Sequence, residues 1–174
     1  RLEQAERAEG LDLGLRVLIG GRQACVSASD TSRRTLDEMA ARAVAMAREA
    51  PEDPHAGLAD PADLAAARDA AGLEIEDPSP DPEAAALEAA AREAEAAAMA
   101  VPGTTQVEAS GGFSRQRVVL VATNGFTGGY GRTSRSVSAV AFTGTGTGME
   151  RDWAGETRAH AADNSGDDHA ASAG

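Results

Sequence analysis

The sequence contains no lysine, one cysteine and only five aromatic residues among its 174 positions. The single Cys25 excludes a disulfide-stabilised scaffold, which needs cysteine pairs, and it favours a cytoplasmic protein. No run of about 18 apolar residues occurs, which argues against a transmembrane protein. Arginine supplies all 16 basic side chains against 28 acidic ones, and the net charge of −12 argues against a general nucleic-acid-binding protein.

Large apolar side chains are scarce as well. Alanine accounts for 40 residues, whereas Leu, Val, Phe and Ile together account for 26 of 174, about 15%. That fraction lies below the level of roughly 20% at which a charged chain is suspected of disorder. The deficit is uneven, because the segments around Val17 and Leu120 are well supplied. The composition therefore indicates a thin core, as in one layer of a larger protein.

The first block, residues 11–50, has the pattern of a β-hairpin followed by a helix. Apolar residues alternate over 13–19, Gly20-Gly21 is a strong hairpin turn signal, and 23–28 forms the return strand. We interpret Cys25 on that strand as a small buried core residue rather than a nucleophile. Leu36, Met39, Ala43, Met46 and Ala50 then recur at steps of three and four, which predicts one stripe of an amphipathic helix.

The remainder of the sequence predicts an alanine-rich helix and an antiparallel sheet. Residues 77–82 are interpreted as a rigid linker or turn, and residues 83–99 are almost entirely helix formers, with a narrow face of Leu87, Ala91, Ala94 and Ala98. Residues 104–157 favour three to four strands, with 118–122 buried on both faces and a turn at Asn124-Gly125. We therefore expect an α+β fold, a two-layer α/β sandwich with a largely antiparallel sheet and packed Ala-rich helices.

Two motifs with possible chemistry favour structural interpretations. Gly144, Gly146 and Gly148 follow a predicted strand, but the next residues lack the helical pattern that a phosphate-binding loop needs, so a loop or weakened strand is favoured. A second group resembles a metal site only in its residue types, since its spacing matches no ligand motif, and we interpret residues 162–174 as a polar, frayed tail. This group comprises His160, Asp163, Asp167, Asp168 and His169.

One stretch has a distinct electrostatic character. Between Glu108 and Glu150 there is no acidic residue, yet four arginines occur, with aromatic residues between them. This pattern indicates a surface for an acidic or extended peptide, a partner protein or, with less support, nucleic acid. The alternative is structural: the arginines blunt exposed sheet edges and pair with the acidic helices. The candidate surface consists of Arg115, Arg117, Arg132, Arg135, Phe113 and Tyr130.

Short motifs then follow one another in a fixed order at residues 14–24, 26–30, 42–48, 50–54, 56–61, 123–126 and 148–152. Together they resemble the N-terminal domain of the TldD/PmbA family, once named modulators of DNA gyrase. The pieces Gly20-Gly21-Arg22-Gln23 and Ala50-Pro51-Glu52-Asp53-Pro54 are closer to the PmbA (TldE) branch. The resemblance implies one domain over residues 1–161 that is incomplete at both ends, with the family's first helix and strand before Arg1 and its C-terminal domain after Gly174.

The resemblance also implies a function. Family members are cytoplasmic, and a TldD subunit pairs with a PmbA subunit to form a zinc metallopeptidase that cleaves peptides and unfolded proteins. The zinc motif His-Glu-x-x-x-His belongs to the TldD branch, whereas His55, His160 and His169 are each followed by alanine here. We therefore expect no catalytic and no metal-binding residue in this chain, zinc in the TldD-like partner, and no activity of the chain alone. The expected role is confinement of the peptide substrate and contact with the partner subunit. The alternative is a stand-alone protein- or peptide-binding module that uses the arginine-bearing sheet.

Overall fold

The structure is a computed structural model that describes residues 3–163, and it has the expected α+β architecture. The sequence suggested one domain over residues 1–161. The structure has two compact units, Arg1–Leu64 and Ala65–Gly174, and among the described residues each has its own antiparallel sheet and one α-helix. The strand pairing agrees with this division, because within residues 3–163 no strand of one sheet hydrogen-bonds to a strand of the other.

The first unit is a hairpin covered by a helix. Strands β1 (Leu13–Ile19) and β2 (Arg22–Ala28) pair in antiparallel register from Leu13 opposite Ala28 to Ile19 opposite Arg22. Gly20 and Gly21 have φ angles of 55° and 74°, the left-handed conformation that a tight primed turn needs. Helix α1 (Arg33–Glu49) begins after Ser32, whose side chain accepts a hydrogen bond from the Thr35 N–H. The predicted hairpin and helix are both confirmed.

Helix α1 packs on one face of the hairpin, and this decides which side chains are buried. Met39, Ala43 and Ala47 form the buried stripe, while Met46, placed on the stripe by the sequence, is 47% exposed. The prediction that Cys25 is buried is wrong, because Cys25 is exposed. Successive residues of a strand alternate between faces, and Cys25 occupies the face of β2 that is more open to solvent than the face of Ala24 and Val26.

We expect Ala43→Leu to lower the free energy of unfolding by about 1–2 kcal/mol, because the added carbons must enter a fully packed contact. Ala43 is 0% exposed between α1 and the hairpin. The matched control is Ala45→Leu, on the exposed side of the same helix, which should change stability by less than about 0.5 kcal/mol. Urea unfolding followed by circular dichroism measures both, and equal effects would contradict this packing.

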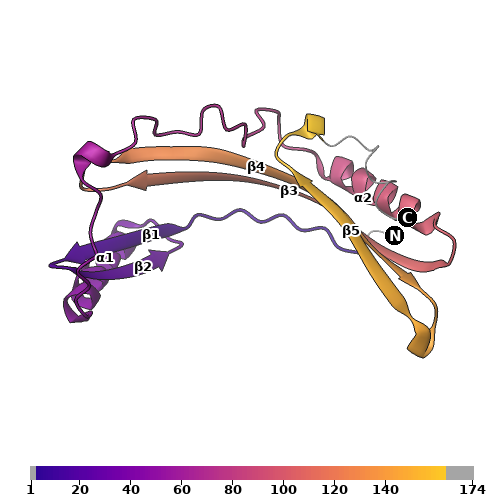
Figure 1. Ribbon diagram of the computed structural model, residues 1–174, viewed down its shortest axis with the longest axis horizontal. Helices are drawn as coiled ribbons and strands as arrows, with labels where there is room; N and C mark the ends of the chain where they lie inside the picture. The colour runs from indigo at the N-terminus through magenta and orange to yellow at the C-terminus, as the bar shows by residue number, and fades with distance from the viewer. Residues whose placement is uncertain (1–2, 164–174) are drawn as a thin grey trace. The chain divides into compact units, whose positions relative to one another are not determined.

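The second unit contains α2 (Ala84–Met99) and strands β3 (Thr104–Val121), β4 (Thr127–Thr143) and β5 (Glu150–Arg158), in the order β3-β4-β5 (Figure 1). The predicted turn at Asn124-Gly125 joins β3 to β4, with Gly125 at a φ of 91°. The glycine string lies in the loop between β4 and β5, as predicted, and includes a short 3₁₀ helix (Gly146–Gly148). Two further 3₁₀ helices occur among the described residues, Pro61–Asp63 at the end of the first unit and Ala161–Asp163 in the second.

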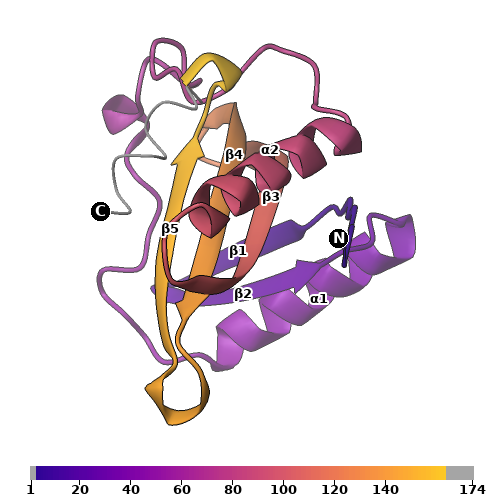
Figure 2. The same ribbon diagram turned by 90° about the vertical axis from the view of Figure 1, so that its right-hand side faces the viewer.

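Helix α2 lies across one face of this sheet (Figure 2). The predicted narrow face of Leu87, Ala91, Ala94 and Ala98 is partly buried, and a Cβ added to Gly111 of β3 would lie 2.5 Å from the Leu87 carbonyl oxygen. The expected burial of residues 118–122 on both faces is wrong, since Val119, Leu120 and Val121 are 59–69% exposed. The contact of α2 is at Gly111, eight or more residues before these positions, so α2 shields a different part of β3.

The loop of residues 65–81 covers the edge of β4 that β5 leaves unpaired. Strand β5 pairs with β4 only as far as Arg158 opposite Arg135. Beyond that point the Gly129 N–H donates to the Arg68 carbonyl at 2.9 Å, and the Thr133 N–H donates to the Ile75 carbonyl at 3.0 Å. The loop thereby satisfies backbone groups that would otherwise be an open sheet edge. Among residues 3–163, no helix is both long enough and apolar enough to cross a membrane.

Candidate peptide-binding site

The six candidate residues do not form one surface. Successive residues of a strand point to opposite faces of the sheet, and paired residues of neighbouring strands share a face. One face of β3 therefore has Phe113, Arg115 and Arg117, and the other has Gln116 and Val118. Because Phe113 pairs with Arg135, this pair lies on the same face as Arg115. Gln116 pairs with Arg132 and Val118 with Tyr130, which places Arg132 and Tyr130 on the opposite face. Sequence spacing could not show this division, because it depends on the register between the strands.

Arg115 is held by the acidic loop that precedes α2. Its Nε donates to Asp81 Oδ1 at 2.8 Å, and one of its terminal nitrogens lies 3.3 Å from Glu76 Oε1. The guanidinium also donates to the carbonyls of Asp77 and Ser79, at 3.2 and 2.8 Å. The hydrogen bond and the charge of Asp81 raise the pKa of Arg115, so the guanidinium stays charged. Arg115 therefore fastens the loop to the sheet, and its acidic partners lie in this loop rather than in the helices that the structural alternative named.

Phe113 and Arg135 belong to the same cluster. The Arg135 guanidinium lies 4.9 Å from the centre of the Phe113 ring, and Arg115 lies 5.8 Å from it. The Arg135 side chain is only 12% exposed and its Nε is 3.7 Å from Asp77 Oδ2. Arg117 is 78% exposed and lies 3.8 Å from Glu76. This cationic face is thus already paired with acidic side chains of the same chain, which leaves little uncompensated charge for an acidic ligand.

Asp77 is the central residue of this cluster, and sequence reasoning missed it. It is 3% exposed, and its backbone N–H donates to Thr133 Oγ1 at 2.7 Å while its carboxylate accepts from the N–H groups of Ser79 and Ala161. Hydrogen bonds from the Ser79 side chain, then from the Ala161 and Ser79 backbone, hold the pKa of Asp77 well below its ordinary value. Thr133 Oγ1 in turn donates to the Ala159 carbonyl at 2.8 Å. Asp77 and Thr133 thus join the loop, β4 and the segment after β5.

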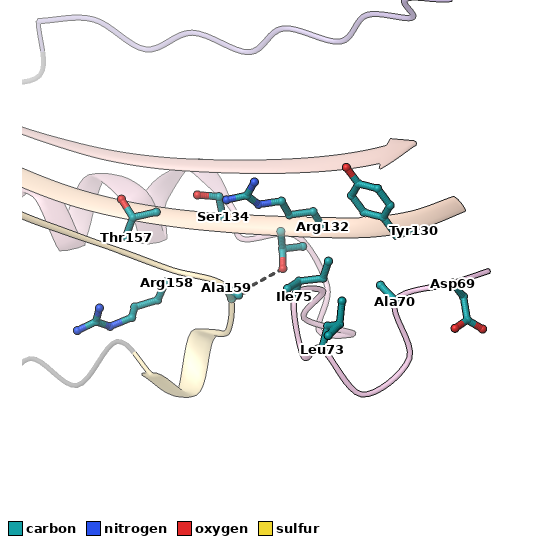
Figure 3. Close-up of a pocket in the computed structure, with 11 residues that line it drawn as sticks. Asp69, Ala70, Leu73, Ile75, Tyr130, Arg132, Ser134, Thr157, Arg158 and Ala159 are labelled. Atoms are coloured by element: carbon teal, nitrogen blue, oxygen red, sulfur yellow. Dashed lines mark hydrogen bonds between the residues drawn. The ribbon is translucent and has the colours of Figure 1, made fainter. Parts of the chain in front are cut away.

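A pocket of about 430 Å³ lies where the loop bows away from β4 (Figure 3). Its loop side consists of Asp69, Ala70, Leu73 and Ile75, and in Figure 3 Leu73 and Ile75 rise toward the strand. The other walls come from the strands and the segment after β5: Tyr130, Arg132, Thr133, Ser134, Thr157, Arg158 and Ala159. The volume lies in the range typical of small-ligand sites. Arg132 and Tyr130 are therefore the two candidate residues that line a concave site.

The described residues do not offer a metal site. Within residues 3–163 no three His, Cys, Asp or Glu side chains come together as a metal ion would require. His160 instead places its Nε2 2.8 Å from the Glu74 carbonyl oxygen, a contact that holds the loop. Of the group that resembled a metal site, Asp167, Asp168 and His169 lie outside the described residues. A bound zinc ion therefore does not fit the part of the chain that the structure describes.

Two family models match the sequence of this chain. One, described as PmbA/TldA metallopeptidase domain 1, matches residues 1–47, and the other, described as the PmbA/TldA metallopeptidase central domain, matches residues 75–174. The chain belongs to the PmbA/TldD metallopeptidase family. The two matches fall in the two structural units, one in each. The predicted membership of the TldD/PmbA family is thereby confirmed, and the second match extends the resemblance to the central domain.

A solved structure shares the fold. The crystal structure of a protein from Bacteroides thetaiotaomicron VPI-5482, described as a candidate modulator of DNA gyrase, superposes with a TM-score of 0.76 at 22% identity. The match covers 87% of this chain and 35% of the other, so the chain spans about a third of that protein's length. Comparison with curated proteins gave no match. At this identity the likeness establishes the fold alone.

Asp77 and Thr133 could have been found from the sequence only in part. The segment Asp77-Pro78-Ser79 has an acidic residue two positions before a serine, a pattern typical of an Asx turn. That pattern predicts the local bond from Ser79 N–H to Asp77. It contains no sign of Thr133 or Ala161, which lie 56 and 84 residues further along the chain.

Proposed function

We propose that this chain supplies the first and central domains of a PmbA/TldE-like subunit in a cytoplasmic zinc metallopeptidase complex. In this role it contributes no catalytic residue. It helps to confine a peptide substrate and contacts a TldD-like subunit that carries the zinc. The observation behind the proposal is the pair of family-model matches in consecutive order along the chain.

The chemistry of the chain supports a non-catalytic role for these two domains. None of its three histidines precedes a glutamate, so His-Glu-x-x-x-His does not occur within the 174 residues. Hydrolysis of a peptide bond by zinc needs protein ligands and a bound water that the metal activates. Since the described residues bring no three such ligands together, we assign the zinc to the TldD-like subunit.

Complex formation tests the proposal. We expect the full chain, mixed with a TldD-like subunit that contains His-Glu-x-x-x-His, to co-elute with it in size-exclusion chromatography. The chain alone should leave an unfolded protein substrate intact, and the mixture should cleave it in a chelator-sensitive manner. Separate elution together with unchanged cleavage by the TldD-like subunit would refute the proposal.

The second candidate is a stand-alone module that binds peptides through the arginine-bearing sheet. One observation favours it, namely that Arg132 makes no ion pair within the described residues and lines the pocket. This candidate predicts peptide binding by the chain alone that a TldD-like subunit does not alter. The flanking DNA also distinguishes the two, since an open reading frame that continues past Gly174 beside a gene for a His-Glu-x-x-x-His protein supports the peptidase subunit.

A further inference from the structure

We propose that the pocket between the 69–75 loop and β4 binds a peptide at a carboxylate that adjoins an apolar side chain. The apolar side chain would enter the pocket, and Arg132 with Ser134 would bind the carboxylate. This inference rests on the proposed function only in taking a peptide as the ligand. It adds a defined binding site and a chemical preference to that function.

The floor of the pocket is apolar and open. Ala70, Leu73, Ile75 and Ala159 line it, and Leu73 is 66% exposed. An exposed leucine next to a concavity gains free energy when a ligand removes it from water, in proportion to the apolar area buried. The floor is also fixed in place, because the Ile75 carbonyl accepts from Thr133 N–H and the Arg68 carbonyl accepts from Gly129 N–H on either side of it. The loop therefore presents a preformed apolar surface.

Arg132 supplies the charge at the rim. Arg115, Arg117 and Arg135 on the other face each lie within 4.0 Å of an acidic side chain, and Arg158 lies 3.3 Å from Glu156. Arg132, by contrast, forms no ion pair within residues 3–163. Its exposed guanidinium keeps its donors for a ligand, and a carboxylate matches the geometry of that group.

Ser134 provides a second donor on the same side. Arg132 and Ser134 are two residues apart on β4, so both project from one face, and both line the pocket. In Figure 3 the Arg132 side chain extends along β4 toward Ser134, while the Arg158 guanidinium points away from the loop. Arg158 is therefore not assigned to the carboxylate. Asp69 lies at the far end of the loop, with its carboxylate pointing away from β4 in Figure 3.

The geometry thus combines one cation, one hydroxyl and an adjoining apolar floor. A free peptide C-terminus after an apolar residue has this combination, and so does an aspartate next to an apolar residue within a longer peptide. The shared chemistry is a single carboxylate beside an apolar side chain. A peptide without a carboxylate would leave Arg132 unpaired and lose the charge-assisted hydrogen bond.

The test measures fluorescence anisotropy of short labelled peptides titrated with the full chain. We expect a peptide ending in Ala-Leu with a free carboxylate to bind, and its C-terminal amide to bind about tenfold more weakly. An amidated peptide with an internal Asp-Leu pair shows whether the bound carboxylate comes from the chain terminus or from an aspartate side chain. Binding as tight as the free acid indicates a side-chain carboxylate, and binding as weak as the amide indicates a chain terminus.

Variants locate the site. Arg132→Gln should weaken binding of the free acid about tenfold and leave the amide unchanged, and Leu73→Ser should weaken both peptides by about three- to tenfold. Arg151→Gln is the matched control, since Arg151 is exposed, projects from the same sheet face through its pairing with Phe142, and lies outside the pocket. Melting temperatures equal to that of the unmodified chain verify folding, and Arg132→Lys, which keeps the charge, should retain part of the affinity.

The proposal is overturned if no peptide binds, if acid and amide bind equally, or if Arg132→Gln and Arg151→Gln have the same effect. Each of these results is independent of co-elution with a TldD-like subunit. If no peptide binds at the pocket while the chain still co-elutes with a TldD-like subunit, only this inference is refuted. Loss of the complex with peptide binding intact would refute only the peptidase-subunit role.

Discussion

Asp77→Asn is expected to lower the melting temperature of the chain by on the order of 10 °C at neutral pH. The Asp77 carboxylate accepts from the N–H groups of Ser79 and Ala161 and lies 3.7 Å from Arg135. Asparagine must turn a donor toward one of these N–H groups, and it leaves the nearly buried Arg135 without its anion. Thermal unfolding followed by circular dichroism measures the change.

The same residue gives stability a defined pH dependence. The folded pKa of Asp77 lies below its ordinary value, so its stabilising contribution is fully present above the unfolded pKa of about 3.9 and is lost as the pH falls toward the folded pKa. We therefore expect the difference in melting temperature between the unmodified chain and Asp77→Asn to be constant from neutral pH to about pH 5 and to shrink below about pH 4.

A matched substitution separates this effect from the loss of a local turn. Asp69 also accepts a hydrogen bond from the N–H two residues ahead, that of Ala71, but it is exposed and within residues 3–163 makes no hydrogen bond or ion pair to another segment. Asp69→Asn should leave the melting temperature within about 2 °C of the original. Equal losses from both substitutions, or a difference that persists unchanged at pH 3, would contradict the assigned role of Asp77.

Gly111→Ala is expected to reduce the free energy of unfolding by about 3 kcal/mol. A Cβ at this position would lie 2.5 Å from the Leu87 carbonyl oxygen of α2, a backbone atom that cannot rotate away. The helix would have to move off the sheet, and the contact of its alanine face with β3 would loosen along its length. Urea unfolding of the full chain measures the loss, and near-ultraviolet circular dichroism of the aromatic side chains, among them Tyr130 of β4 and Trp153 of β5, reports on packing in the sheet.

The neighbouring glycine is the control. A Cβ at Gly112 would project from the opposite face of β3 and lie 2.9 Å from Ser136 Oγ, a hydroxyl that can rotate. Gly112→Ala should therefore cost no more than about 1 kcal/mol. If Gly112→Ala proves as costly as Gly111→Ala, then the loss reflects glycine in the strand generally and not the close approach of α2.

Arg115 and Arg132 have different roles in the structure that the sequence alone does not distinguish. Both arginines lie in the stretch that has no acidic residue, and from the sequence both belong to one candidate surface. The acidic partners of Arg115 are at positions 76 and 81, before α2, and only the fold brings them to β3. Charge reversal of Arg115 should therefore damage the fold, whereas Arg132 is the position that tests ligand binding.

The burial of individual strand residues also could not be predicted from the sequence alone. Val118 to Val121 have the apolar composition of an inner strand, yet Leu120 is 59% exposed, because α2 packs on an earlier part of β3, at Gly111. Cys25 has the small apolar neighbours of a core residue, but it occupies the more open face of a two-stranded sheet. In both cases the local pattern predicts a strand correctly and leaves open which face is covered.

The sequence by itself determined the elements and the family. Glycine pairs, alternating apolar residues, an alanine-rich segment and an Asn-Gly turn act over a few residues, so the two hairpin turns, both helices and the α+β class followed from local preferences. The short motifs that follow one another in a fixed order along the chain likewise identified the PmbA/TldD family. The tertiary structure alone decided the division into two units, the opposite faces of Arg115 and Arg132, the joining of Asp77 to Thr133 and the pocket beside β4. These depend on strand register and on contacts between residues far apart in the chain, which no local pattern specifies.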